Sequence, residues 1–107
     1  MNYALLESAP PHTGPSFIRY LRDNNVVVFD LKYWLVIENC KYHHKLGNRG
    51  WLTAFIKCDD NSQAKEIGGH EWEDLFKHMP ESWEVLIKAP MNRSVKRFHI
   101  HFIEKLK

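Results

Sequence analysis

The chain has 107 residues, a length typical of one domain with a core of moderate size. Hydrophobic residues make up 44% of it and aromatic residues 13%, which excludes an intrinsically disordered chain. With 15 Lys and Arg against 13 Asp and Glu, the net charge of +2 is too balanced for a protein that coats duplex nucleic acid. A local cluster of charges could still bind a free nucleotide or another small phosphate ligand.

The N-terminus has neither the basic segment nor the long apolar run of a signal peptide. No stretch approaches the roughly 18 apolar residues of a transmembrane helix, so we expect no contact with a membrane. The two cysteines, Cys40 and Cys58, lack the Cys-x-x-Cys spacing of a zinc site. Two free thiols suit a reducing compartment, with a single disulfide as the alternative, and we expect a cytoplasmic protein.

The pattern of apolar residues predicts one domain over residues 15–107, preceded by an N-terminal arm over residues 1–14 that is rich in Pro and Gly. In chain order we expect a helix over 16–25, strands over 26–30, 33–39 and 51–57, a helix over 70–78, and strands over 83–88 and 95–104. Residues 40–50 are predicted to form a loop. The fold class that follows is α+β, a five-stranded antiparallel sheet packed on one side by two helices.

The chemistry-bearing segment is the last predicted strand. Alternate strand residues point to the same face, so Phe98, Ile100 and Phe102 form an apolar face, and Arg97, His99, His101 and Ile103 lie on the other. A neutral imidazole can attack phosphorus, act as a base or bind a metal, and an adjacent arginine can hold phosphate oxygens. Taken alone, a His-x-His pair is more often a pair of ordinary polar-face residues, and it is also a common pair of metal ligands.

The segment Ser94-Val95-Lys96-Arg97-Phe98-His99-Ile100-His101-Phe102-Ile103 resembles the signature of the histidine triad (HIT) family of nucleotide hydrolases and transferases. That signature reads Ser-Val-x-His-φ-His-φ-His-φ-φ, where φ is apolar, and it aligns without a gap. Arg97 stands in place of the first histidine. The upstream hairpin and the strand over 51–57 are similar to the family in pattern, so the likeness extends over residues 26–104 and is specific only in the last ten.

The resemblance implies a HIT-like fold and a covalent nucleotidyl-histidine mechanism that needs no metal or other cofactor. His99 would be the nucleophile, with His101 and Ser94 positioning oxygens. The phosphate would be held by Arg97, Arg93 and Asn92, and the ribose by Glu38 or Asn39 at the end of the hairpin. An aromatic residue of the hairpin, Phe29 or Trp34, is a candidate to stack on the base. The resemblance thus implies a nucleotide substrate. Family members commonly form homodimers through the central helix and a neighbouring strand, so we also expect a homodimer.

Three alternatives follow from the same residues. The leading hypothesis is a hydrolase of nucleotide phosphoesters, phosphoanhydrides or phosphoramidates, or a nucleotidyl transferase. Arg97 motivates the second, a nucleotide-binding or regulatory module that has lost turnover. The third is a metal-dependent enzyme that uses His99 and His101 with a third ligand. The chain also departs from the family where Met91-Asn92-Arg93 replaces the usual Gly-Gly-Gln.

Overall fold

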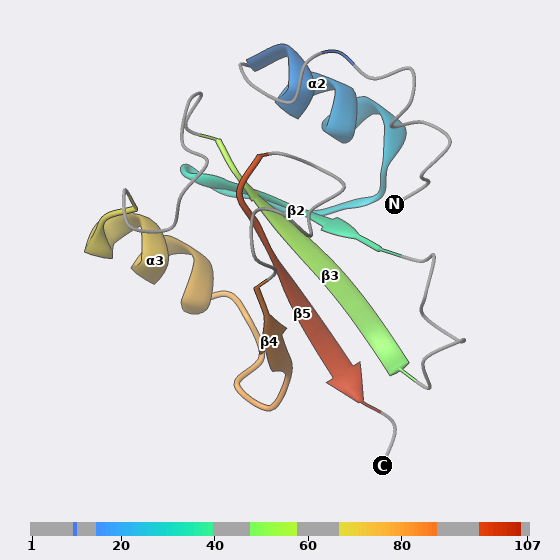
Figure 1. The fold of residues 1–107 in the computed structure, drawn as a ribbon, viewed down its shortest axis with the longest axis vertical. Helices are drawn as coiled ribbons and strands as arrows, with labels where there is room; N and C mark the ends of the chain where they lie inside the picture. Colours follow the sequence, from blue (N-terminus) through green and yellow to red (C-terminus); the bar gives the residue numbers. More distant parts are fainter. Residues whose placement is uncertain (1–9, 11–14, 40–47, 58–66, 88–96, 106–107) are drawn as a thin grey trace.

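The computed structural model describes residue 10 and residues 15–39, 48–57, 67–87 and 97–105 (Figure 1). Their elements, in chain order, are α2 (Pro15–Asn24), β1 (Val27–Asp30), β2 (Trp34–Glu38), β3 (Asn48–Ile56), α3 (Gly69–Phe76), β4 (Glu84–Leu86) and β5 (His99–Lys105). The strands form one antiparallel sheet in the order β1-β2-β3-β5-β4. This confirms the predicted α+β class with a five-stranded antiparallel sheet and two helices. Neither described helix has the length and apolar character needed to cross a membrane.

Residues at both ends of α2 suit the unpaired backbone groups found at a helix terminus. Pro15 begins α2, where its missing N–H costs no hydrogen bond. At the other end, the side-chain amides of Asn24 and Asn25 donate to the carbonyl groups of Tyr20 and Leu21 at 2.8 and 3.0 Å. The Leu21 carbonyl is one of the last four of the helix, which have no i+4 partner within it, and Asn25 satisfies it.

The helix α3 is tied to the hairpin of β1 and β2. The Trp34 indole N–H donates to the Glu71 carbonyl at 2.7 Å, and the Asp74 carboxylate accepts from the backbone N–H of Tyr33 at 3.1 Å. These two bonds join the first turns of α3 to the start of β2, a contact between segments nearly 40 residues apart. The helix is therefore held in place by polar contacts as well as by its apolar face.

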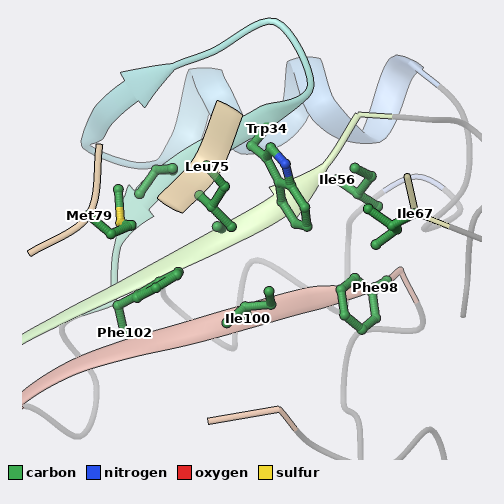
Figure 2. Packing of buried hydrophobic residues seen from close by; sticks show 10 residues of the cluster. Trp34, Ile56, Ile67, Leu75, Met79, Phe98, Ile100 and Phe102 are labelled. Atoms are coloured by element: carbon green, nitrogen blue, oxygen red, sulfur yellow. The ribbon is translucent and has the colours of Figure 1, made fainter. Parts of the chain in front are cut away.

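Each face of the sheet carries its own apolar cluster. The α3-side core consists of Trp34, Val36, Ala54, Ile56, Ile67, Leu75, Met79, Phe98, Ile100 and Phe102. Figure 2 shows Phe98, Ile100 and Phe102 on the same side of β5, facing Leu75 and Met79. The α2-side core consists of Phe17, Ile18, Leu21, Leu35, Ile37 and Phe55. Burial of each large side chain contributes about 1.5–3 kcal/mol relative to exposure.

The expectation that both helices cover one side of the sheet is wrong. Residues 34–37 of β2 are all completely buried, and in a strand successive side chains point to opposite faces. Apolar residues on both faces need cover on both faces, and α2 and α3 supply it separately. The α2 side is the one that matters for the site, because it is the face that carries Phe55, the residue paired with His99.

The starts of two strands differ from the prediction by three residues or more. β3 begins at Asn48 instead of residue 51, because Asn48 and Gly50 pair with Lys105 and Glu104 through an irregularity in the register. Residues 48–50 therefore belong to a strand, although their composition is typical of a loop. β5 begins at His99, so the described residues Arg97 and Phe98 precede it.

Candidate functional site

His99 and His101 lie next to one another on the α2-side face of β5. In the register of β3 and β5, His99 pairs with Phe55 and His101 pairs with Thr53. The two imidazole rings are 5.0 Å apart between centroids and nearly perpendicular, at 85°. Their exposed fractions are only 5% and 4%. The predicted division of β5 into an apolar face and a histidine face is therefore confirmed.

The hydrogen bond of His99 determines which of its nitrogens carries the proton. Its Nδ1 lies 2.8 Å from the backbone carbonyl oxygen of Arg97. A carbonyl oxygen only accepts, so the imidazole donates through Nδ1–H. In the neutral ring the lone pair then lies on Nε2. The ring also packs on Phe55, with 5.1 Å between centroids, which restricts its orientation.

His101 has a different environment. The Trp51 indole N–H donates to its Nδ1 at 2.9 Å, and the Thr53 hydroxyl oxygen lies 3.1 Å from the same nitrogen. The side-chain amide of Asn39 in turn donates to the Thr53 hydroxyl at 3.2 Å. All of these side chains are buried, and buried polar groups of this kind depend on one another for hydrogen bonds.

Arg97 serves the backbone at the end of β3. Its Nε donates to the Ile56 carbonyl at 2.5 Å and its Nη2 to the Lys57 carbonyl at 2.9 Å, and the residue is 2% exposed. The Phe98 carbonyl also accepts from the backbone N–H of Ile56 at 3.3 Å, so backbone pairing with β3 extends to the residue before β5. These contacts assign the Arg97 side chain an anchoring role; its predicted contact with phosphate stays a prediction.

The predicted ribose-binding and base-binding residues separate. Asn39 is buried on the histidine face, where it hydrogen-bonds to Thr53. Glu38 is exposed and, as the preceding strand residue, points to the opposite face. Phe29 also lies on that opposite face, because it pairs with Val36 and packs against the α3-side core.

The structure therefore places Glu38 and Phe29 on the face of the sheet opposite His99, and their contacts with ribose and base stay predictions. The alternation of side chains along β2, with the pairing of β1 to β2, places both on the α3 side of the sheet. Trp34, the other aromatic candidate, also belongs to the α3-side core. Ser94, Arg93 and Asn92, predicted to position oxygens and to bind phosphate, lie outside the described residues.

Two residues of the site were not predicted. Trp51 and Thr53 were expected only as ordinary residues of β3. A signal was present for Thr53, since a hydroxyl interrupts the otherwise apolar run Trp51-Leu52-Thr53-Ala54-Phe55-Ile56. The partner of that hydroxyl depends on the register between β3 and β5, which the order of residues in either strand does not reveal.

Within the described ranges, no three His, Cys, Asp or Glu side chains converge as metal ligands. The metal-dependent alternative would therefore need a third ligand from another part of the chain. Searches of protein-family models, of curated proteins and of solved structures each returned no match. Function is therefore inferred from the geometry of the histidine face and from the resemblance in the segment over residues 94–103.

Proposed function

We propose that this protein is a HIT-like nucleotide hydrolase or nucleotidyl transferase that works through a covalent nucleotidyl-His99 intermediate. The observation that carries the proposal is the hydrogen bond from His99 Nδ1–H to the Arg97 carbonyl. An imidazole attacks phosphorus with a nitrogen that has a lone pair, and this bond leaves the lone pair on Nε2. A nucleophile oriented through its other nitrogen is the arrangement that such chemistry requires.

The reaction would proceed in two steps, transfer of the nucleotidyl group to His99 and its release to an acceptor. His99 Nε2 donates its electron pair to the α-phosphorus, the N–P bond forms, and the bond from phosphorus to the leaving group breaks with its electron pair. The leaving group takes up a proton from bulk water, and the positive charge of the substituted imidazole is shared with the Arg97 carbonyl through Nδ1–H. Water, which gives up a proton to bulk solvent, or a second phosphate then attacks phosphorus, the N–P bond breaks, and the electron pair returns to Nε2.

Access to His99 is part of this mechanism. An imidazole with 5% of its surface exposed cannot accept a nucleotidyl group without movement of the residues around it. Substrate binding should therefore be accompanied by opening of the α2-side face. Asn39 is linked to His99 through two hydrogen bonds, to Thr53 and from Thr53 to His101, and then through the ring contact between the two histidines. Its amide is the described polar group best placed to meet the ribose when the α2-side face opens.

A specific observation also favours the second candidate, a nucleotide-binding module without turnover. Arg97 occupies the position of the first histidine of the triad, and a guanidinium keeps its proton at every physiological pH. It cannot exchange a proton with the leaving group or with water as a histidine does. Its two bonds to backbone carbonyls further hold it in a structural role.

A turnover panel separates these functions. Nucleoside phosphoramidates, dinucleoside polyphosphates and sugar nucleotides would be incubated with the wild type, with His99→Ala and with His70→Ala, an exposed histidine of α3 that serves as the matched control. We expect release of nucleoside monophosphate by the wild type and by His70→Ala, and none by His99→Ala. A wild type that is inactive but is stabilised by nucleotides against thermal unfolding would support the binding module. A wild type that shows no activity and is not stabilised by nucleotides would contradict both functions.

We also propose that the protein forms a homodimer through β4. Val85, Leu86 and Ile87 are 47%, 39% and 49% exposed, and within the described part of the chain β4 pairs with β5 alone. An exposed apolar edge strand favours pairing with another strand. Phe76 of α3, 44% exposed and 5.8 Å from Phe102 between ring centroids, extends the same apolar surface.

Sedimentation velocity tests the dimer. Val85→Lys should shift the protein to the monomer, because it places a charge in the proposed interface. Val26→Lys is the matched control: Val26 is 60% exposed and precedes β1, at the opposite edge of the sheet. A wild type that sediments as a monomer, or equal effects of the two variants, would exclude the β4 interface.

A further inference from the structure

The contact between Trp51 and His101 has a consequence for the chemistry of the site. We propose that Trp51 is a positioning residue that holds His101 as the neutral tautomer with its proton on Nε2, so that His101 acts as a hydrogen-bond donor beside the ring of His99. The proposal rests on the proposed function only for the use of that donor, and the tautomer itself can be measured without turnover.

The direction of the hydrogen bond follows from the chemistry of the indole. An indole nitrogen donates and never accepts, so at 2.9 Å the His101 Nδ1 must offer a lone pair. The neutral ring then carries its proton on Nε2. Protonation of Nδ1 would set two N–H donors against each other in a buried site, which favours the neutral ring.

The position of Trp51 in the sheet explains how the indole reaches the imidazole. Trp51 pairs with Ile103, so His101 is its diagonal neighbour on β5, within reach of a long aromatic side chain. The two rings meet edge to face, at 5.5 Å between centroids and 87°. Trp51 is 7% exposed, and a buried indole has few alternative conformations.

The Thr53 hydroxyl is compatible with the same tautomer, and because a hydroxyl can either donate or accept, the indole alone selects it. Asn39 donates to the Thr53 oxygen, which leaves the Thr53 hydroxyl proton available for the lone pair of His101 Nδ1 at 3.1 Å. Trp51 and Thr53 thus both lie within hydrogen-bond distance of His101 Nδ1. A buried chain of polar groups is stable only when each donor meets an acceptor, and here that condition is met with Nδ1 as the acceptor.

The two histidines therefore have opposite tautomers. His99 donates through Nδ1 and has its lone pair on Nε2, whereas His101 accepts at Nδ1 and has its proton on Nε2. A nucleophile beside a neutral donor suits attack on a phosphorus whose oxygen gains negative charge, because the donor can bind that oxygen as the charge develops. Trp51 would act through His101 and need not touch the substrate.

The test is a long-range ¹H–¹⁵N correlation spectrum of the histidine side chains, which reports the protonated nitrogen of each ring. We expect His101 of the wild type to carry its proton on Nε2 and His99 on Nδ1. Trp51→Phe keeps an aromatic ring but removes the donor, and should shift His101 toward the Nδ1–H form while His99 stays unchanged. In an active enzyme, kcat of this variant should fall at least about tenfold with little change in KM.

The matched control is Trp34→Phe. Trp34 is completely buried and its indole, like that of Trp51, donates a hydrogen bond, here to a backbone carbonyl at 2.7 Å, but it lies on the α3 side of the sheet. It should lose comparable stability without altering His101. The proposal is overturned if His101 of the wild type is protonated on Nδ1, a result that does not depend on the folding of any variant. It is also overturned if a folded Trp51→Phe leaves the tautomer unchanged. A shifted tautomer in a protein without turnover would support the positioning role and contradict the proposed enzyme.

Discussion

Replacement of Arg97 by histidine tests whether the guanidinium anchors the end of β3. The substitution introduces the residue that the histidine triad signature has at this position. It also removes two charge-assisted hydrogen bonds, to the carbonyl groups of Ile56 and Lys57. An imidazole has too few donors to replace both, so we expect a loss of stability even though the site gains the family's residue.

The magnitude follows from the surroundings of the two carbonyls. Ile56 is 1% exposed, and a buried acceptor left without a donor costs about 1–3 kcal/mol. Lys57 is half-buried, so water can replace part of the bond to its carbonyl, and its share should be about 1 kcal/mol. The cost of burying the charged guanidinium is recovered in the variant and lowers the total. We expect the free energy of unfolding to fall by about 1–3 kcal/mol.

Urea unfolding followed by tryptophan fluorescence and by circular dichroism measures this difference. Arg22→His is the matched control, because Arg22 binds Asp30 at 2.9 Å with both side chains 41% exposed. An exposed pair of this kind contributes less than about 1 kcal/mol. If Arg97→His loses no more stability than Arg22→His, the anchoring role is wrong, and the guanidinium is then available for the predicted phosphate contact.

Two further predictions concern stability away from the histidines. Gly50→Ala should lower the free energy of unfolding in urea by about 1–3 kcal/mol, since its new Cβ would lie 2.8 Å from the Trp83 ring. Gly69→Ala is the control: its new Cβ meets nothing within 4 Å, so it should leave the free energy of unfolding unchanged. Equal values for the two variants would contradict the contact between Gly50 and Trp83. Hydrogen bonds from Arg22 and, with a smaller effect, from Lys57 lower the pKa of Asp30. The stability that its carboxylate contributes is therefore present above about pH 4 and is lost as the pH falls through the lowered pKa. The difference in unfolding free energy between wild type and Asp30→Asn should therefore be constant near neutral pH and shrink below about pH 4; a difference that grows in acid would refute the assignment.

Most of the elements could be predicted because their signals are local. The apolar spacing of Phe17 and Leu21 and the β-branched run that begins at Val26 each determine a segment from within. The end of β3 at Ile56 was also close to its predicted position. Its beginning was not, because residues 48–50 enter the strand through pairing with β5, a partner some 50 residues away.

The site was predictable in part for the same reason. His99 and His101 are two residues apart in one strand, so alternation alone places them together. Phe29 and Glu38 were assigned to them from their order in the hairpin, but the face each occupies depends on the pairing of three strands. Trp51 could not be identified, because its indole meets an imidazole that is diagonal to it across a long-range pair.

The order of the strands also bears on synthesis of the chain. β5 lies between β3 and β4 in the sheet although it follows both in sequence (Figure 1). As the chain leaves the ribosome, β3 and β4 must therefore wait with unpaired edges until β5 has been made, since neither is the neighbour of the other. β5 thus carries the two imidazoles, an apolar strip and the pairing that both β3 and β4 need. A ribosome that stalls before His99 would leave a chain with two exposed strand edges, a ready substrate for chaperones and proteases.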